Sequence, residues 1–154
     1  MADLLIRPAT PADAEAVSAV LKALIAAGKR RKTGEAAFVL EHYIRHPDQT
    51  SCLVAERAGK VLGFQSLKLA TPGNPYGTPV GWGIIGTHIH PDAARNGVGR
   101  ALAAHTMVAA RAAGIRRIEA QTGTENLAAL AFYGAIGFAP AEGGTPGVLI
   151  CDLD

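Results

Sequence analysis

Two glycines separated by one residue, Gly97 and Gly99, stand between an apolar, β-branched run and a long alanine-rich segment. If a helix begins there, its first backbone N–H groups have no internal acceptor, and its dipole leaves partial positive charge at that end. Glycines let a diphosphate approach the backbone closely, and Arg95 and Arg100 add full positive charges beside it. This stretch therefore predicts a binding site for a phosphate-bearing cofactor.

The elements that must position this loop alternate along the chain, which we expect to form one domain over residues 1–154. Hydrophobic periodicity and helix caps predict strands at 4–7, 52–56, 61–68, 82–90, 117–121 and 148–153, and helices at 10–28, 35–45, 98–113 and 126–136. Residues 57–60 join two strands as an antiparallel hairpin, whereas the strand, helix and strand of 82–121 favour a parallel pair. The expected fold is therefore α/β (of α+β type) with a mixed sheet.

The composition excludes several classes of protein. A formal net charge of +2 and 5% aromatic residues are not typical of a protein with a nucleic-acid-binding surface. Cys52 and Cys151 lack metal-ligand spacing, so we expect reduced thiols and no metal. No signal peptide and no membrane-spanning run are predicted, so we expect a cytoplasmic protein with no membrane partner.

Two other phosphate-binding folds do not match the glycine loop. A nucleotide-binding P-loop needs Gly-Lys-Ser/Thr at its end, and Gly99-Arg100-Ala101 lacks it. A dinucleotide fold places its glycine turn after the first strand, whereas this turn lies two-thirds of the way along the chain. A nucleotide-binding switch remains the weakest alternative.

Four segments together resemble the GNAT superfamily of acyl-CoA-dependent N-acetyltransferases, and the resemblance covers nearly the whole chain. They are IRPATPADAEAVSAVL (6–21), CLVAERAGKVLGFQSL (52–67), HPDAARNGVGRAL (90–102) and NLAALAFYGAIGF (126–138). The third is similar to the family's pyrophosphate loop, and the fourth to its Asn-x-x-Ala-x-x-x-Tyr-x-x-x-x-Gly-Phe motif. The resemblance implies a mixed sheet of about six to seven strands with about four helices, and acetyl-CoA as co-substrate.

The resemblance also implies which residues hold coenzyme A. The diphosphate would be wrapped by Arg95, Asn96, Gly97, Val98, Gly99 and Arg100. The strand residues Thr87, His88 and Ile89 would offer their backbone to the pantetheine arm as an added strand does. That role requires strands 82–90 and 117–121 to separate at their ends. One position departs from the family, because its usual Gln/Arg falls on Ala94 and Arg95 stands one residue later.

The resemblance gives two further roles to the last predicted helix. Asn126 and Tyr133 lie two turns apart on one face of that helix. The resemblance implies that Asn126 contacts the cofactor arm and that Tyr133 is a general acid beside the cofactor sulfur. A phenol is suited to this task because its ordinary pKa near 10 keeps it protonated at neutral pH. The alternative is that Tyr133 only packs against Leu130 and Phe138.

The general base is open in the sequence. The family often carries a glutamate on the strand that corresponds to 82–90, but the only titratable side chains here are His88 and His90. Imidazole has a suitable ordinary pKa, so His88 is a candidate base, although a core position is an alternative. Glu35, Glu41 and His42 on the second predicted helix are others.

The acetyl acceptor is predicted to bind beside the irregular segments 28–48 and 70–81. The basic run 29–32 could attract an acidic acceptor or form a solvated loop, and Tyr76 and Trp82 could line a pocket or anchor a loop. The predicted function is transfer of an acetyl group from acetyl-CoA to a primary amine, by direct attack in a ternary complex. The alternative is a non-catalytic acyl-CoA-binding regulatory module; a homodimer is one expectation for the oligomeric state.

Overall fold

A seven-stranded mixed sheet forms the centre of the molecule, in the spatial order β1-β2-β3-β4-β5-β7-β6. The computed structural model describes residues 3–153. The strands are β1 (Leu5–Pro8), β2 (Gln49–Arg57), β3 (Lys60–Leu69), β4 (Gly83–Ile89), β5 (Arg117–Gln121), β6 (Ala139–Pro140) and β7 (Val148–Asp152). Only β4 and β5 pair in parallel, and all other neighbours are antiparallel. The predicted mixed sheet is confirmed; β6 was not predicted because two residues carry no periodicity.

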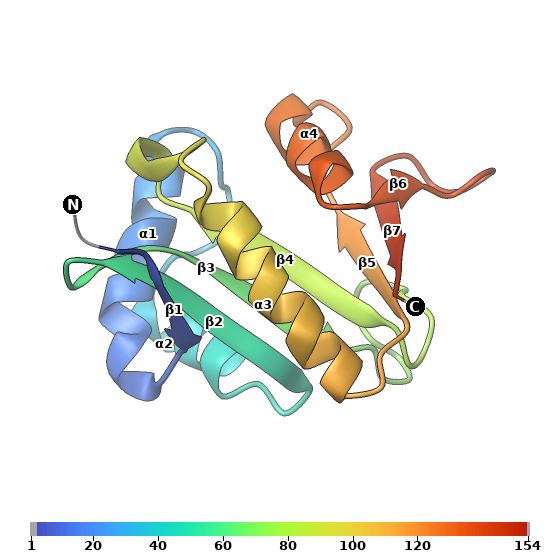
Figure 1. Cartoon of the computed structure of the whole chain (residues 1–154), viewed down its shortest axis with the longest axis horizontal. Coiled ribbons are helices and arrows are strands. Elements are labelled where there is room, and N and C mark those ends of the chain that lie inside the picture. Colours follow the sequence, from blue (N-terminus) through green and yellow to red (C-terminus); the bar gives the residue numbers. More distant parts are fainter. Residues whose placement is uncertain (1–2, 154) are drawn as a thin grey trace.

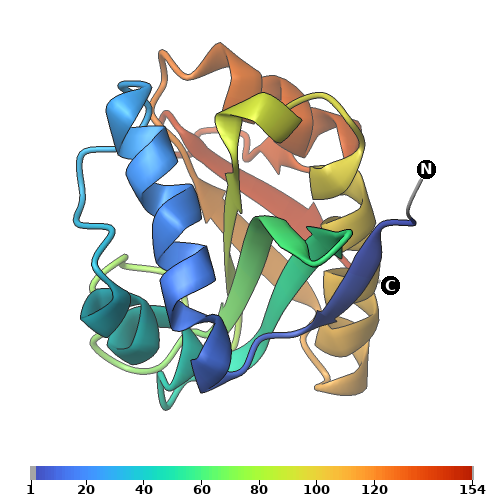
Figure 2. The ribbon, with the colours of Figure 1, turned by 90° about the vertical axis from the view of Figure 1, so that its left-hand side faces the viewer.

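Helices cover both faces of this sheet (Figures 1 and 2). The helices α1 (Ala14–Ala26) and α2 (Ala36–Val39) lie on one face, and α3 (Val98–Ala112) lies on the other. On the α3 face, residues of α4 (Leu127–Ala135) pack against side chains of β4, β5 and β7. Short 3-10 turns at Pro11–Asp13 and Pro91–Ala93 precede α1 and α3. The two faces of the sheet therefore have separate cores.

The second predicted helix, 35–45, is not a uniform α-helix. Regular α-helix covers only Ala36–Val39, and Leu40–Ile44 form a π-helical turn. The turn ends where the N–H of Arg45 donates to the carbonyl of Leu40 at 2.7 Å. The side-chain amide of Gln49 then donates to the carbonyls of Tyr43 and Ile44, at 2.7 and 2.9 Å. π turns often occur at functional sites. Tyr43 lies in this turn, and its hydroxyl contacts His88, a candidate site residue described below.

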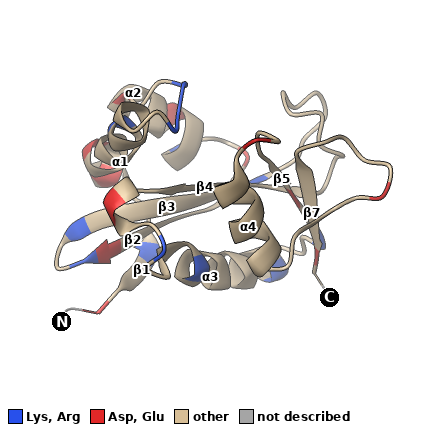
Figure 3. Ribbon diagram, turned by 90° about the horizontal axis from the view of Figure 1, so that it is seen from above, with Lys and Arg blue, Asp and Glu red and all other residues tan. Residues whose placement is uncertain are grey.

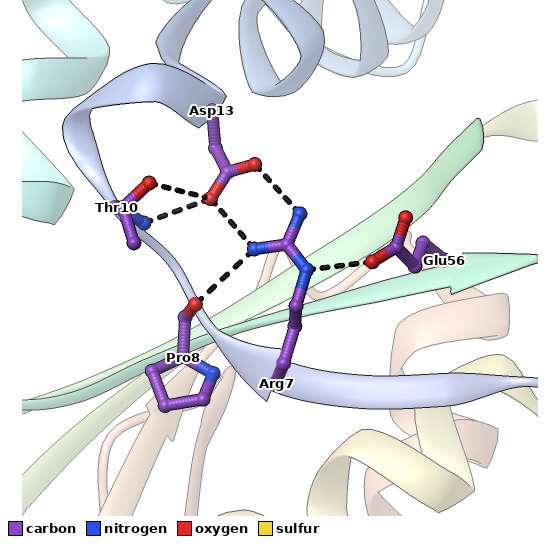
Figure 4. A network of polar contacts seen from close by, with 5 residues as sticks. All are labelled: Arg7, Pro8, Thr10, Asp13 and Glu56. Atoms are coloured by element: carbon purple, nitrogen blue, oxygen red, sulfur yellow. Dashed lines mark hydrogen bonds and ion pairs between the residues drawn. The ribbon is translucent and has the colours of Figure 1, made fainter. Parts of the chain in front are cut away.

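The edge strand β1 is tied to the start of α1 by an ionic network (Figure 4). The Arg7 guanidinium donates to both carboxylate oxygens of Asp13, at 2.9 and 2.8 Å, and to Glu56 of β2 at 2.6 Å. Asp13 also accepts the backbone N–H of Thr10 at 2.8 Å, which completes a capping box at the start of the predicted helix 10–28. The network fixes α1 against the sheet.

The strands β4 and β5 separate after a short common stretch. Their parallel pairing joins Gly83–Ile85 to Ile118–Ala120, and within residues 3–153 the remainder of β4 has no partner on that side. Figure 1 shows the two strands diverging toward α4. The separation that the resemblance required is confirmed. It leaves the edge of β4 beyond Ile85 open on the side that faces β5.

Candidate active site

The loop before α3 has two left-handed positions, separated by Asn96. Arg95 has φ +66° and Gly97 has φ +77°, and Gly97 is the N-cap of α3. The first bond back to the cap runs from Ala101 N–H to the Gly97 carbonyl at 3.0 Å, so the preceding N–H groups have no acceptor within the helix. Arg95 and Arg100 are both exposed beside these donors. The loop therefore presents N–H groups and positive charge to solvent.

Gly97 and Gly99 have different tasks. A Cβ at Gly97 would meet no described heavy atom within 4 Å, so the space over this cap is open. A Cβ at Gly99 would lie 2.7 Å from the ring of Phe132 on α4. Gly99 therefore lets α3 and α4 approach each other, and Gly97 keeps the loop open to a large anion.

These features fit coenzyme A. Open N–H donors and two arginines suit a diphosphate, and the unpaired edge of β4 suits the amide groups of a pantetheine arm. The part of β4 that pairs with β3 but not with β5 contains the predicted residues Thr87, His88 and Ile89.

Tyr133 faces the open edge of β4. Its hydroxyl donates to Oγ1 of Thr87 at 3.0 Å, and the Nε2 of Gln65 on β3 donates to the same atom at 2.9 Å. Burial raises the pKa of Tyr133, and hydrogen bonds from Thr87 oppose that rise. The phenol is therefore protonated at neutral pH. Its ring also packs against Phe138, with centroids 5.2 Å apart, which is one of the contacts that the packing interpretation predicted.

His88 points to the opposite face of the sheet. Its ring stacks on Phe64 at 4.7 Å, and its Nε2 lies 3.4 Å from the hydroxyl of Tyr43. Burial, with the nearby charge of Arg30, lowers the pKa of His88 to about 3. The imidazole is therefore neutral, and it is a weak base in this environment.

His90 and Asn126 each cap the start of a helical segment. His90 lies beyond the end of β4, and its Nδ1 accepts the backbone N–H of Asp92 at 3.1 Å. It therefore shares no strand with His88, contrary to the predicted strand 82–90. Asn126 is exposed and begins α4, where its Oδ1 accepts the N–H of Ala129 at 3.1 Å.

The candidates on the second predicted helix also have distinct places. Glu41 is exposed, and Glu35 is exposed with an ion pair to Lys22 at 3.5 Å. His42 stacks on Phe38 at 4.6 Å, and its Nε2 lies 3.4 Å from the hydroxyl of Tyr76. Of these three residues, His42 is the one that the structure connects to the site.

A cavity of about 370 Å³ opens at the carboxyl end of β5. It is lined by Tyr76, Gly77, Glu119, Gln121, Thr122, Thr145, Pro146, Gly147 and Val148. Tyr76 thus lines a cavity, whereas Trp82 is absent from this lining and stacks under Arg117, whose guanidinium carbon lies 5.0 Å from its centroid.

Glu119 is the residue that the sequence analysis missed. It is 6% exposed, faces the cavity, and accepts hydrogen bonds from Thr78 and from Gln121, the latter at 3.0 Å. The available signal was a carboxylate in the middle of the short strand Arg117–Gln121, whose central residues are buried. A charge at such a position needs partners or a function.

Comparisons with known proteins identify the class. The model of the acetyltransferase (GNAT) family matches residues 18–138, and the chain belongs to this family. A GNAT-family acetyltransferase from Streptococcus pneumoniae is 22% identical with a TM-score of 0.77, covering 99% of this chain and 100% of that chain. A comparison with curated protein sequences gave no significant match.

Two further solved structures share the fold. A GNAT-family acetyltransferase from Brucella melitensis in complex with acetyl-CoA is 22% identical, with a TM-score of 0.74 and coverage of 100% of this chain and 90% of that chain. A ribosomal-protein-alanine N-acetyltransferase from the same organism is 24% identical, with a TM-score of 0.73 and coverage of 95% and 96%. Acetyl-CoA is the co-substrate of this family. Within residues 3–153, no helix is long and apolar enough to cross a membrane, and no three side chains group as metal ligands.

Proposed function

We propose that this chain transfers an acetyl group from acetyl-CoA to a primary amine, by direct attack while both substrates are bound. The observation that carries the proposal is the Tyr133 hydroxyl, held 3.0 Å from Thr87 at the unpaired edge of β4. The protonated phenol on α4, the open edge of β4 and the glycine loop before α3 are the three features that support it. The bound co-substrate supplies an activated acetyl thioester.

The loop and the strand edge would bind and orient the co-substrate. Backbone N–H groups of Asn96 to Gly99 would hold the diphosphate, and Arg95 and Arg100 would add charge. Thr87 to Ile89 would pair with the pantetheine arm, and Asn126 would contact it from the start of α4. An N–H near Ile89 would stabilise negative charge on the acetyl oxygen, an effect worth about 3 kcal/mol when aligned.

Tyr133 would act as the general acid. Its proton is available at neutral pH because burial favours the neutral phenol. Donation of that proton to the departing sulfur avoids releasing a thiolate into a poorly hydrated site, and such catalysis contributes about 10²- to 10⁴-fold.

The acceptor ammonium must lose a proton before it attacks. His88 is a weak base here, because burial and nearby cations disfavour its charged form. Glu119 lines the cavity at the end of β5 and presents a carboxylate to it. We therefore favour Glu119 as the group that binds the ammonium and receives its proton directly or through water, with His88 as the alternative.

The decisive experiment measures thiol release from acetyl-CoA with a panel of primary amines, together with calorimetric binding of coenzyme A. We expect turnover with at least one amine, and Tyr133→Phe should lower kcat about 100-fold while coenzyme A binds unchanged. Glu119→Gln should lower kcat more than His88→Gln does. Tight binding of coenzyme A without turnover on any amine would instead support the non-catalytic acyl-CoA-binding module.

A further inference from the structure

We propose that the acetyl acceptor carries a carboxylate as well as its amine, and that a cationic cluster on the α1 and α2 face binds this carboxylate. The cationic cluster is defined as Arg30, Lys32 and Lys68, which lie near the aromatic side chains of Phe38, His42 and Tyr43. The inference rests on the proposed function and adds the chemical class of the acceptor.

Lys68 is a buried ammonium without a counter-ion. Lys68 lies on β3 and is 5% exposed, and its Nζ lies 5.6 Å from the ring centroid of Tyr43. No carboxylate lies within 4 Å of it among residues 3–153. Burial lowers the pKa of Lys68 to about 8, although the charge of Asp48 opposes the change. Because an unpaired buried charge is costly, an anion from outside the chain is the missing partner.

Arg30 approaches the same tyrosine from the loop after α1. Its guanidinium is anchored by the carbonyl of Thr33 at 2.9 Å, and its Cζ lies 5.9 Å from the ring centroid of Phe38. Burial raises the pKa of Tyr43, and the nearby charge of Arg30 opposes that rise. The guanidinium thus lies over Phe38, whose ring meets that of Tyr43 edge-on with centroids 5.9 Å apart, and its fork of N–H donors suits an oxyanion.

The walls of the cluster are aromatic rings and neutral imidazoles. Burial, together with Lys68 and Lys32, lowers the pKa of His42 to about 4. His88 lies 3.4 Å from the Tyr43 hydroxyl and is also uncharged at neutral pH. The cations themselves disfavour protonation of these rings, so the charge of the region comes from Lys68, Arg30 and Lys32. Figure 3 shows the basic loop beside α1 and α2.

The cationic cluster adjoins the cavity that holds Glu119. Tyr76 lines that cavity, and its hydroxyl lies 3.4 Å from Nε2 of His42. In the sheet, Lys68 pairs with Ile84, and Ile84 pairs with Glu119. Lys68 and Glu119 are thus two strands apart on one row, about 10 Å between their backbones. A carboxylate in the cavity and positive groups beside it are complementary to a molecule with an ammonium and a carboxylate.

The test compares common α-amino acids with their matched carboxamides. The carboxamide has the less basic amine, so a larger fraction of it is unprotonated and able to attack at neutral pH. A preference of the enzyme for the amino acid must therefore come from binding of its carboxylate. We expect kcat/KM to be about tenfold higher for the best amino acid than for its carboxamide. Binding of both compounds to the protein loaded with coenzyme A, measured by calorimetry, should show the same order without requiring turnover.

Substitutions assign the effect to the cluster. Lys68→Met should raise KM for that amino acid about tenfold with kcat nearly unchanged, and it should leave the carboxamide unaffected. Arg30→Gln, on a loop, gives a second variant whose folding is not at risk, with the same pattern at roughly threefold. Lys60→Met removes an exposed lysine from the same strand and should change neither compound.

Several outcomes would overturn the inference. One is an equal kcat/KM for carboxamides and amino acids. Another is an equal loss of kcat/KM for both compounds in Lys68→Met. The third is that no amino acid binds to the protein loaded with coenzyme A. Turnover confined to amines without a carboxylate would reject the inference and leave the proposed function standing. Carboxylate-dependent binding without any turnover would support the cluster and reject the proposed chemistry.

Discussion

The hydroxyl of Tyr133 on α4 donates a hydrogen bond to Oγ1 of Thr87 on β4, at 3.0 Å. The two residues are 46 positions apart, and they meet because β4 leaves β5 after Ile85. Thr87 is held in turn by Gln65, which is fully buried on β3. The proposed acid is therefore oriented through two residues that need not touch the substrate with their side chains.

Gln65 is predicted to be a positioning residue. Its Nε2 donates to Thr87, and its Oε1 has no hydrogen-bond partner in the part of the chain that the structure describes. In Gln65→Leu we expect kcat to fall about tenfold, with KM for acetyl-CoA nearly unchanged, because Tyr133 loses its fixed direction. The free energy of unfolding should change by about 1 kcal/mol or less, since the lost bond is offset by removal of an unpartnered carbonyl.

The control for Gln65 is Thr106→Val on α3. Thr106 is another fully buried residue, and its hydroxyl has no hydrogen-bond partner within residues 3–153. This substitution should leave kcat unchanged, as measured by steady-state kinetics. A parallel loss of kcat in both variants would contradict a role specific to Tyr133.

Arg95 and Ala58 form a matched pair, because both are non-glycine residues at positive φ. Glycine at either position relieves a strain of about 1 kcal/mol in the folded state and adds freedom to the unfolded state, so stability should change little. Only Arg95→Gly removes a charge from the proposed diphosphate site. We expect its affinity for acetyl-CoA to fall roughly three- to tenfold, less at high salt, in calorimetric titrations. Equal affinities of the two variants would remove Arg95 from the site.

Gly99 should be sensitive to a single methyl group. Because its Cβ would lie 2.7 Å from the Phe132 ring, Gly99→Ala should destabilise the fold by about 1–2 kcal/mol in denaturant unfolding. Gly134→Ala in α4 meets nothing within 4 Å and should stabilise by about 0.5–1 kcal/mol. Combining Gly99→Ala with Phe132→Leu should recover part of the loss; no recovery would argue against the close α3–α4 contact as the cause.

The Arg7–Asp13 pair should make stability depend on pH below neutrality. Arg7 lowers the pKa of Asp13 below its ordinary value of 3.8. A lowered folded-state pKa gives stability that is complete above the ordinary value and is lost as pH falls through the folded value. Asp13→Asn should therefore cost about 2 kcal/mol at pH 7, and the difference from the native protein should shrink below about pH 4. Unfolding curves at stepped pH measure this; a constant difference would exclude the ion pair as its source.

Much of the framework could be predicted from the sequence because its signals are local. The capping residues Thr10 and Asp13, the hairpin at 57–60 and the start of α3 at Val98 depend on near neighbours, and the structure has each of them. Strand ends shifted by a few residues where side chains were polar, as at Gln49–Ser51 of β2. The π-helical turn was not predicted, because it depends on how Gln49 closes the helix end.

The sequence alone was enough to predict most of the order of the elements, the glycine loop that begins α3 and the two helical turns that separate Asn126 from Tyr133. Turn chemistry and periodicity act over a few residues, so these features needed no knowledge of distant neighbours. Three features came from the folded chain alone: β4 and β5 separate, His88 faces Tyr43, and Glu119 opens onto a cavity. The fold also buries Lys68, with no carboxylate within 4 Å of it in the described residues 3–153. Such relationships are set by strand register and by packing between segments far apart in the chain, which no local pattern encodes.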